Sequence, residues 1–209
     1  VGDSFAEDLT NAIYESNLDK YIQISGYRIP GRCGVLMLEI EMFEDFIDRD
    51  CRSNATFDNK ILLERLIEAD EIWLSSSWPF WTSSFMADSV KNIRRYNENI
   101  VIFGKKSFGF VDSRIYLYES EDQWSNPFLN INENHYNQLE KLNTNLKKQA
   151  LSSGARFIDT QKLICNGNLY CSNYQENSII SYDGGHLTPL GAKLFGQKLK
   201  EEFKGNYVF

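Results

Sequence analysis

Short apolar runs alternate with amphipathic helical patterns along this chain, and this alternation limits its fold more than any other feature. Three apolar runs are typical of buried strands: 72–74, 100–103 and 156–158. Apolar residues at helical spacing precede the first run, over 59–69, and separate the others, over 85–96 and through 139–146. Parallel strands joined by helices form a sheet that is covered on both faces. The sequence therefore predicts an α/β fold with a mainly parallel sheet.

Further elements are predicted on either side of these runs. Apolar residues recur at helical spacing directly after Ser4, so a helix is expected to begin at this serine. Thr188 and Pro189 form a typical helix start, with threonine as the N-cap and proline at the first helical position. The alternating segment 21–24 predicts a strand. Two segments without a clean period are predicted as loops over the sheet: 105–134 and 166–183.

Length and charge limit the class of protein. A chain of 209 residues suits one α/β domain better than two, so we expect a single domain over 1–209. A net charge of -7 and a pI near 5.0 leave no basic field for a phosphate backbone, and we expect no nucleic-acid partner. The most apolar stretch, 34–38, is far shorter than the roughly 20 residues of a bilayer span, so no membrane span is expected.

The four cysteines fall as two local pairs, Cys33 with Cys51 and Cys165 with Cys171. Even, paired spacing is typical of an oxidising compartment, so we expect two short-loop disulfides and a periplasmic or extracellular location. Four unpaired buried thiols in a cytoplasmic enzyme are the alternative. The chain has no Cys-x-x-Cys and only two histidines, and we expect no metal site and no other cofactor.

Two stretches near opposite ends of the chain supply the parts of a serine acyl-transfer site. A serine hydroxyl needs a base within hydrogen-bond reach and a group that orients this base. Ser4 opens a helix, and Asp183 precedes His186 by three residues in a glycine-rich turn. The other histidine, His135, lies at the start of a long helix, where a packing or capping role is expected. We therefore predict Ser4 as nucleophile, His186 as base and Asp183 as the carboxylate that fixes the tautomer of the base.

Negative charge that develops on the substrate oxygen requires donors aimed at it. The backbone N–H of Ser4 is well placed at a helix N-terminus. Gly34, which is expected to follow a second strand, and Ser77, at the end of the third, are further candidates for this oxyanion hole; for Ser77 a structural hydrogen-bonded role is an equally good interpretation. Trp78 follows at the position where a substrate would lie, with core packing as the alternative to substrate binding.

These residues resemble the sequence blocks of the SGNH hydrolase superfamily, also called GDSL-like esterases and lipases. Gly-Asp-Ser at 2–4 is similar to the first block and Asp-Gly-Gly-His at 183–186 to the last, so the resemblance spans the whole chain. It implies a flavodoxin-like three-layer α/β/α fold and the triad named above. The third block departs from the family: where Gly-x-Asn-Asp is usual, residues 74–78 read Leu-Ser-Ser-Ser-Trp.

The missing asparagine, the tryptophan after the third strand and the two cysteine pairs are similar to one subgroup. This subgroup is the SGNH domain fused behind the membrane part of acyltransferase-3 family O-acyltransferases, which decorate bacterial surface polysaccharides such as O-antigen. The resemblance implies acetyl transfer to a sugar hydroxyl in the periplasm, with an acylated carbohydrate or polysaccharide as substrate and a fused membrane acyltransferase domain as partner. It also fits the abrupt start of the chain, where only Val1 precedes the first block although a strand needs about five residues.

Two other functions stay open at this point. One is a catalytically weak domain that binds carbohydrate or positions the acceptor, which the missing asparagine favours. The other is a free-standing secreted esterase. The sequence also leaves open whether the acyl group passes to a sugar or to water.

Overall fold

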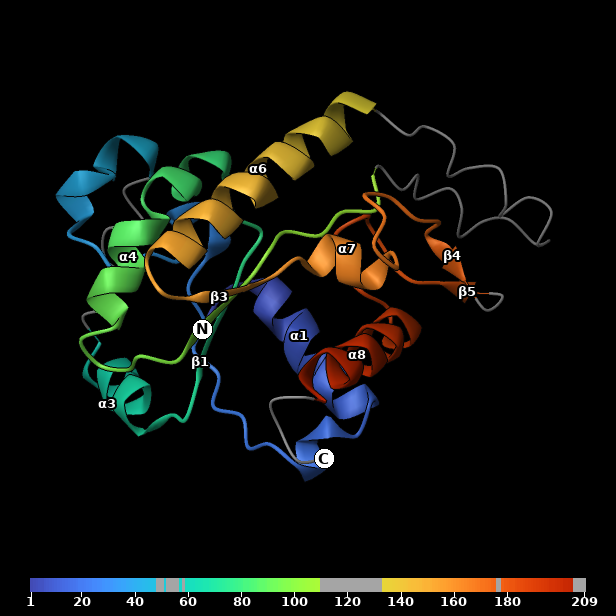
Figure 1. Cartoon of the computed structure of the whole chain (residues 1–209), viewed down its shortest axis with the longest axis horizontal. Coiled ribbons are helices and arrows are strands. Elements are labelled where there is room, and N and C mark those ends of the chain that lie inside the picture. The colour runs from blue at the N-terminus through green and yellow to red at the C-terminus, as the bar shows by residue number, and fades with distance from the viewer. Residues whose placement is uncertain (48–50, 52–56, 58, 110–132, 176–177, 205–209) are drawn as a thin grey trace. The chain divides into compact units, whose positions relative to one another are not determined.

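The computed structural model describes residues 1–47, 51, 57, 59–109, 133–175 and 178–204 (Figure 1). Its residues group into two compact units. The first comprises Val1–Glu7, Ser25–Lys105 and Lys141–Asp159, and the second Asp8–Ile24, Lys106–Glu140 and Thr160–Phe209. The single domain expected over 1–209 stays a prediction.

A parallel three-stranded sheet organises the first unit. Its strands are β1 (Ile72–Ser75), β2 (Ile100–Phe103) and β3 (Arg156–Ile158), hydrogen-bonded in that order. Gly2 forms isolated parallel bridges to Ser75 on one side and to Arg28 on the other. Across the sheet the neighbours are therefore Arg28, Gly2, β1, β2 and β3. Numbered by their order in the chain, these segments give 2-1-3-4-5, which is the flavodoxin-like order. The predicted α/β fold with a mainly parallel sheet is confirmed.

Helices cover this sheet through one apolar cluster. They are α3 (Lys60–Glu68), α4 (Met86–Ile93) and the part of α6 (Glu133–Ser152) that belongs to the first unit. Alternate strand residues pack with these helices in the cluster: Ile72, Leu74, Ile100 and Ile102 with Leu62, Leu66, Val90, Ile93, Leu142 and Leu146. The helix expected over 59–69 begins at its N-cap Asn59, but it buries Leu62 and Leu66 and leaves Ile61 and Ile67 exposed.

Short 3-10 helices occupy much of the remaining first unit: η2 (Gly31–Cys33), η3 (Ile40–Met42), η4 (Glu44–Phe46) and η5 (Phe80–Ser84).

The predicted disulfide between Cys33 and Cys51 is confirmed, and both cysteines are buried. It closes a loop across a separation of 18 residues. By loop-closure entropy such a crosslink stabilises the fold by about 3 kcal/mol.

The second unit is built from helices and one small hairpin. It contains most of α1 (Ser4–Glu15), followed by η1 (Leu18–Lys20), α7 (Thr160–Ile164), β4 (Tyr174–Gln175), β5 (Ser178–Ile179) and α8 (Pro189–Phe203). The helix start predicted at Thr188 is confirmed, since its Oγ1 accepts a hydrogen bond from the Gly191 N–H at 3.1 Å. α8 passes close to α1 at Gly196, where a Cβ would collide with the Ala12 carbonyl oxygen.

Two predictions for this unit were wrong in part. Residues 21–24 form no strand; they run after η1 with side chains that alternate between exposed and half-buried. Residues 166–183 are not all loop, because the antiparallel pair β4–β5 lies within them. Of the loop predicted over 105–134, residues 110–132 lie outside the described residues, and 105–109 form neither helix nor strand.

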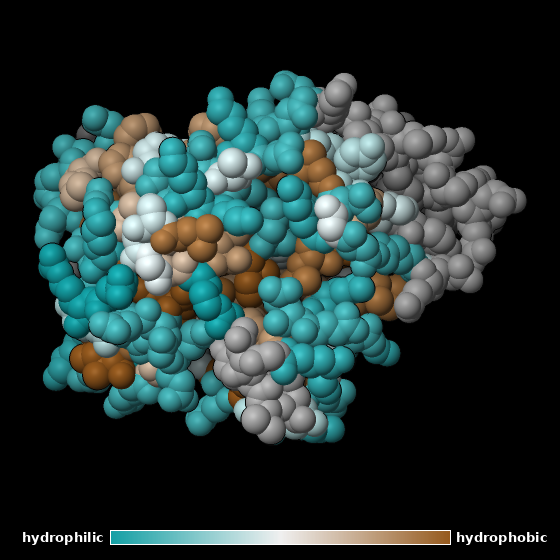
Figure 2. Space-filling model, in the orientation of Figure 1, coloured by the Kyte–Doolittle hydropathy of each residue, from teal (hydrophilic) through white to brown (hydrophobic). Residues whose placement is uncertain are grey.

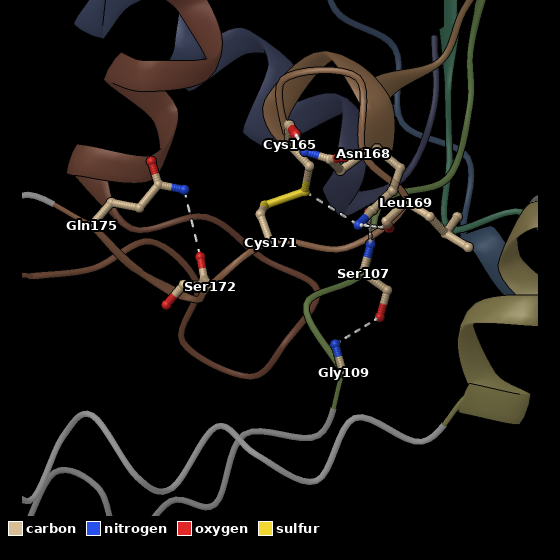
Figure 3. The surroundings of a disulfide bond; sticks show 9 residues. Ser107, Gly109, Cys165, Asn168, Leu169, Cys171, Ser172 and Gln175 are labelled. Atoms are coloured by element: carbon tan, nitrogen blue, oxygen red, sulfur yellow. Dashed lines mark hydrogen bonds between the residues drawn. A yellow bond between two sulfur atoms is a disulfide. The ribbon is translucent and has the colours of Figure 1, made fainter.

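The predicted disulfide between Cys165 and Cys171 is also confirmed (Figure 3). It closes a shorter loop, with a separation of six residues, and by the same entropy argument stabilises the fold by about 2 kcal/mol. The buried Gln161 connects this loop to a distant segment. Its Nε2 donates to the Leu169 carbonyl oxygen at 2.8 Å, and its Oε1 accepts from the Ser107 N–H at 2.7 Å.

The surface agrees with the acidic, polar composition. On the face seen in Figure 2, hydrophilic residues predominate and hydrophobic residues form small patches between them. Among the described helices, none combines the length and the apolar character that crossing a bilayer requires.

Candidate active site

Ser4 lies at the corner between a sheet bridge and a helix, as predicted. The residues before Ser4 pair with the end of β1. The Ser75 N–H donates to the Val1 carbonyl oxygen at 3.1 Å, and Gly2 forms a parallel bridge with Ser75. Only glycine fits there, because a Cβ on Gly2 would collide with the Ser75 carbonyl oxygen. Asp3 then caps the helix, its Oδ1 accepting from the Phe5 N–H at 2.9 Å. α1 therefore begins at Ser4.

The second oxygen of Asp3 ties this corner to the end of β1. Asp3 Oδ2 accepts from the Ser77 N–H at 2.9 Å, from the Ser77 hydroxyl at 2.8 Å and from the Ser76 hydroxyl at 3.0 Å. Asp3 itself is 6% exposed. The sequence analysis missed this role because the partners are more than 70 residues away. The run of serines directly after a strand is the one signal that could have revealed it.

These bonds affect the predicted oxyanion donors. Both donors of Ser77 already bond to Asp3, which favours the structural interpretation of this serine. Gly34 follows the 3-10 helix η2 rather than a strand, and its N–H donates to the Gly31 carbonyl oxygen at 3.0 Å. Gly34 therefore does not directly follow a second strand, as had been expected; η2 directly precedes it. The segment beside Gly2 at this edge of the sheet is 27–29: Gly2 bridges Arg28, its N–H donates to the Tyr27 carbonyl oxygen at 3.1 Å, and its carbonyl oxygen accepts from the Ile29 N–H at 2.8 Å.

Trp78 is buried in the first unit. Its relative exposure is 0%, and its Nε1 donates to the Phe103 carbonyl oxygen at 2.7 Å. A side chain with no exposed surface and a satisfied indole N–H has the contacts of a core residue. The structure therefore favours the packing alternative over substrate binding for Trp78.

Asp183 and His186 form a hydrogen-bonded pair in the second unit. Asp183 Oδ2 lies 2.6 Å from His186 Nδ1, while Asp183 Oδ1 accepts from the backbone N–H groups of Gly185 and His186, both at 2.8 Å. Both side chains are exposed, at 55% for the aspartate and 41% for the histidine. An Nδ1–H that donates to a carboxylate leaves Nε2 as the basic nitrogen.

The carboxylate of this pair is held in its ionised form. Partial burial alone would raise the pKa of Asp183, but the hydrogen bonds from His186 and Gly185 outweigh it, and the pKa lies below its ordinary value of 3.8. Asp183 is therefore charged through the neutral range. A charged carboxylate beside an imidazole stabilises the protonated form of the ring.

The turn around this pair is closed by further hydrogen bonds. Tyr182 N–H donates to the His186 carbonyl oxygen at 3.1 Å, and Gly184 N–H donates to Ser181 Oγ at 3.0 Å. Gly184 has a φ of 88°, a left-handed conformation that favours glycine. Its carbonyl oxygen accepts from the Phe108 N–H at 2.7 Å. The turn thus presents His186 from a rigid backbone.

The three residues of the predicted triad belong to different units. Ser4 lies in the first unit and the Asp183–His186 pair in the second, so a triad that joins them is a proposal. His135 lies in the first turn of α6, with its Nε2 2.8 Å from the Ser107 hydroxyl, in keeping with the structural role expected for it.

Across the described ranges, no cluster of His, Cys, Asp and Glu could hold a metal ion. A cavity of about 480 Å³ lined by Tyr14 and residues 19–24 includes none of the candidate residues.

Comparison with known proteins identifies the architecture. The family model for the SGNH domain (fused to AT3 domains) matches residues 1–201. Among solved structures, the chain is similar to the periplasmic domain of a lipopolysaccharide acetyltransferase from Salmonella ser. Paratyphi A, with a TM-score of 0.63 and 14% identity over 97% of this chain and 81% of that chain. At this identity the likeness concerns the fold, and it confirms the predicted SGNH-type α/β/α fold. No curated protein matches the chain.

Proposed function

The chain belongs to the family of SGNH domains fused to AT3 domains, and from this membership we propose that it transfers a short acyl group, such as acetyl, to a carbohydrate hydroxyl by way of Ser4. One observation carries the proposal: the Asp183 carboxylate lies 2.6 Å from His186 Nδ1, and an Nδ1–H that donates to this carboxylate makes Nε2 the basic nitrogen of the ring. Ser4 supplies the matching nucleophile at the start of α1.

The proposed reaction has two halves. In the first, the Ser4 hydroxyl attacks the carbonyl carbon of the acyl donor while His186 Nε2 takes its proton; the tetrahedral intermediate then expels the donor's leaving group, which receives that proton. In the second, His186 takes the proton of a sugar hydroxyl, whose oxygen attacks the acyl-serine ester. The Ser4 oxygen leaves with the proton, and the acyl sugar is released. Water in place of the sugar gives hydrolysis.

The oxyanion hole is the less complete part of the proposed site. We assign its first donor to the Ser4 N–H, at the N-terminus of a helix of 12 residues. The N–H groups of Gly34 and Ser77 stay candidates, but each would share the hydrogen with the protein acceptor that it already has. A shared donor stabilises an oxyanion less than a dedicated one.

The proposed setting follows from the family and the crosslinks. Two disulfides are typical of a compartment outside the cytoplasm, and we place the chain in the periplasm or at the cell exterior. The proposed partner is a membrane acyltransferase domain in the same protein, as the family description implies. The proposed acceptor is a surface polysaccharide such as O-antigen, supported by the activity named for the similar lipopolysaccharide acetyltransferase.

A chromogenic acetyl ester tests the chemistry directly. We expect turnover by the wild-type chain and a loss of roughly 10³-fold or more in kcat for Ser4→Ala. Ser152→Ala is the matched control, because this exposed serine at the end of α6 bonds only locally to Gln149 among the contacts described for it. Equal turnover by wild type and Ser4→Ala would reject Ser4 as nucleophile. Adding an oligosaccharide acceptor then separates transfer from hydrolysis, as acetylated sugar against free acetate.

One observation favours a second candidate function, a catalytically weak domain that positions the acceptor. The donors of Gly34 and Ser77 are already bonded within the protein, so the oxyanion hole has fewer dedicated donors than a strong esterase requires. A fluorophosphonate probe separates the two functions. A catalytic domain is labelled at Ser4, whereas a pure binding domain has no activated serine and stays unlabelled.

A further inference from the structure

A buried ion pair anchors the backbone on both sides of His186. Lys106 Nζ lies 2.7 Å from Asp8 Oδ2, with the two side chains only 2% and 6% exposed. The same ammonium donates to the Gly185 carbonyl oxygen at 2.7 Å. The other carboxylate oxygen, Asp8 Oδ1, accepts from the Leu187 N–H at 3.1 Å. The pair therefore binds the residue before and the residue after the candidate base.

We propose that Asp8 and Lys106 are positioning residues that hold the His186 turn in its reactive orientation, an inference that rests on the proposed function. They act through the peptide groups of Gly185 and Leu187. Fixing both neighbours restricts the backbone dihedrals of His186 and thereby the direction of its Cα–Cβ bond. A general base works only within hydrogen-bond reach of the proton that it takes, so small errors in this direction reduce the rate.

The place of Asp8 in the chain strengthens the proposal. Asp8 follows Ser4 by four residues in α1, and residues four apart lie on the same side of a helix, one turn along its axis. The helix that begins with the proposed nucleophile therefore also carries the anchor of the base.

The segment of Lys106 is itself held in place. Ser107 N–H donates to Gln161 Oε1 at 2.7 Å, and Phe108 N–H donates to the Gly184 carbonyl oxygen at 2.7 Å. Gln161 in turn bonds to the loop closed by the second disulfide. The ammonium thus reaches the turn from a backbone with little freedom of its own.

Stability alone does not account for this pair. Lys106 is among the largest fully buried side chains of the chain. Removing two charges from water costs free energy that their attraction recovers only in part, so a buried pair contributes little net stability compared with apolar residues of similar size. What the pair provides is a defined geometry, since each charge also bonds a specific peptide group of the turn.

Three variants test the proposal on the whole chain. Lys106→Met removes the ammonium at nearly constant volume, and Asp8→Asn keeps an acceptor for the Leu187 N–H but loses the charge. The double variant Lys106→Met with Asp8→Leu leaves no unpaired buried charge and therefore folds even where a single variant does not. Asp88→Asn is the matched control, since it breaks the exposed ion pair between Asp88 and Lys91.

With the chromogenic acetyl ester, we expect kcat to fall about 10- to 100-fold in all three variants while KM changes by less than about twofold. The fall in kcat of the double variant should not exceed that of the worse single variant, because Asp8 and Lys106 act through the same turn. A fluorophosphonate should label the full fraction of Ser4, but more slowly. A merely structural role predicts the opposite: fewer labelled molecules, each reacting at the wild-type rate.

The possible outcomes are distinct. An active wild-type chain whose folded variants keep the wild-type kcat and labelling rate would overturn this inference alone. A wild-type chain that neither turns over the ester nor reacts with the probe would reject the proposed function, and this inference with it. Slower labelling at full amplitude, with Asp88→Asn unchanged, supports the positioning role.

Discussion

The aspartates of the two candidate motifs, Asp3 and Asp183, have opposite surroundings. Asp3 is 6% exposed and accepts four hydrogen bonds from groups of the first unit. The side chain of Asp183 is 55% exposed and bonds two peptide N–H groups and the imidazole of His186. A buried carboxylate that accepts four hydrogen bonds holds structure, whereas the exposed carboxylate of Asp183 is the one proposed to orient a base for the reaction. Burial and partners, rather than residue type, separate the two roles.

The largest expected effect is that of Asp183→Asn on the reaction. Without the carboxylate, the tautomer of His186 with a basic Nε2 is no longer selected, and we expect kcat for the acetyl ester to fall roughly 10³- to 10⁴-fold. The amide oxygen can still accept from the N–H groups of Gly185 and His186, so the free energy of unfolding should change by less than about 1 kcal/mol. Steady-state kinetics and urea unfolding measure both. A large loss of stability with an unchanged kcat would reverse the roles assigned to the two aspartates.

Asp3→Asn should give the complementary result. The amide presents an NH₂ group to donors from Ser76 and Ser77 and leaves buried donors unsatisfied. We expect a loss of about 2–4 kcal/mol in the free energy of unfolding, measured by urea denaturation. Asp88→Asn, in an exposed ion pair, should change it by about 0.5 kcal/mol or less. A variant that is as stable as wild type would show that Asp3 is not the anchor of this corner.

The smallest expected effect is a pH dependence of stability from Asp183. Its pKa in the folded chain lies below the ordinary value of 3.8, so the folded state favours the ionised form. The contribution to stability is therefore present above the ordinary value and is lost as the pH falls through the lowered one. Because the side chain is exposed, solvent screening keeps this contribution small. The difference in urea midpoint between wild type and Asp183→Asn should stay constant at pH values well above 3.8 and shrink as the pH falls below this value. A difference that stays constant in acid would contradict the lowered pKa.

Much of the fold could be predicted because its signals are local. The apolar runs at β1, β2 and β3 are short and bounded, and the caps of α3 and α8 are set by Asn59 and Thr188. The prediction at 21–24 was wrong because alternation of apolar and polar residues also suits a segment on the surface that lacks a ladder partner. The strands β4 and β5 have two residues each, too few for any periodicity to show.

In the candidate site too, contacts between residues close in sequence could be predicted and contacts between distant residues could not. Asp183 and His186 are three residues apart, so their pairing could be predicted from one turn. The bonds of Asp3 to the serines after β1 and the pair of Asp8 with Lys106 span 73 and 98 residues. No local pattern encodes such pairs, because their geometry depends on the packing of segments that the sequence does not mark as neighbours.

The four-residue spacing between Ser4 and Asp8 should help to recognise distant relatives of this chain by sequence. Inserting or deleting a single amino acid within it would rotate the carboxylate by about 100° around the helix axis and break its bond to Leu187. Homologues that lack the usual asparagine block should therefore tolerate substitutions between these two positions far more readily than changes in length. The motif Gly-Asp-Ser-x-x-x-Asp, together with a distant lysine, gives a pattern by which such chains can be sought.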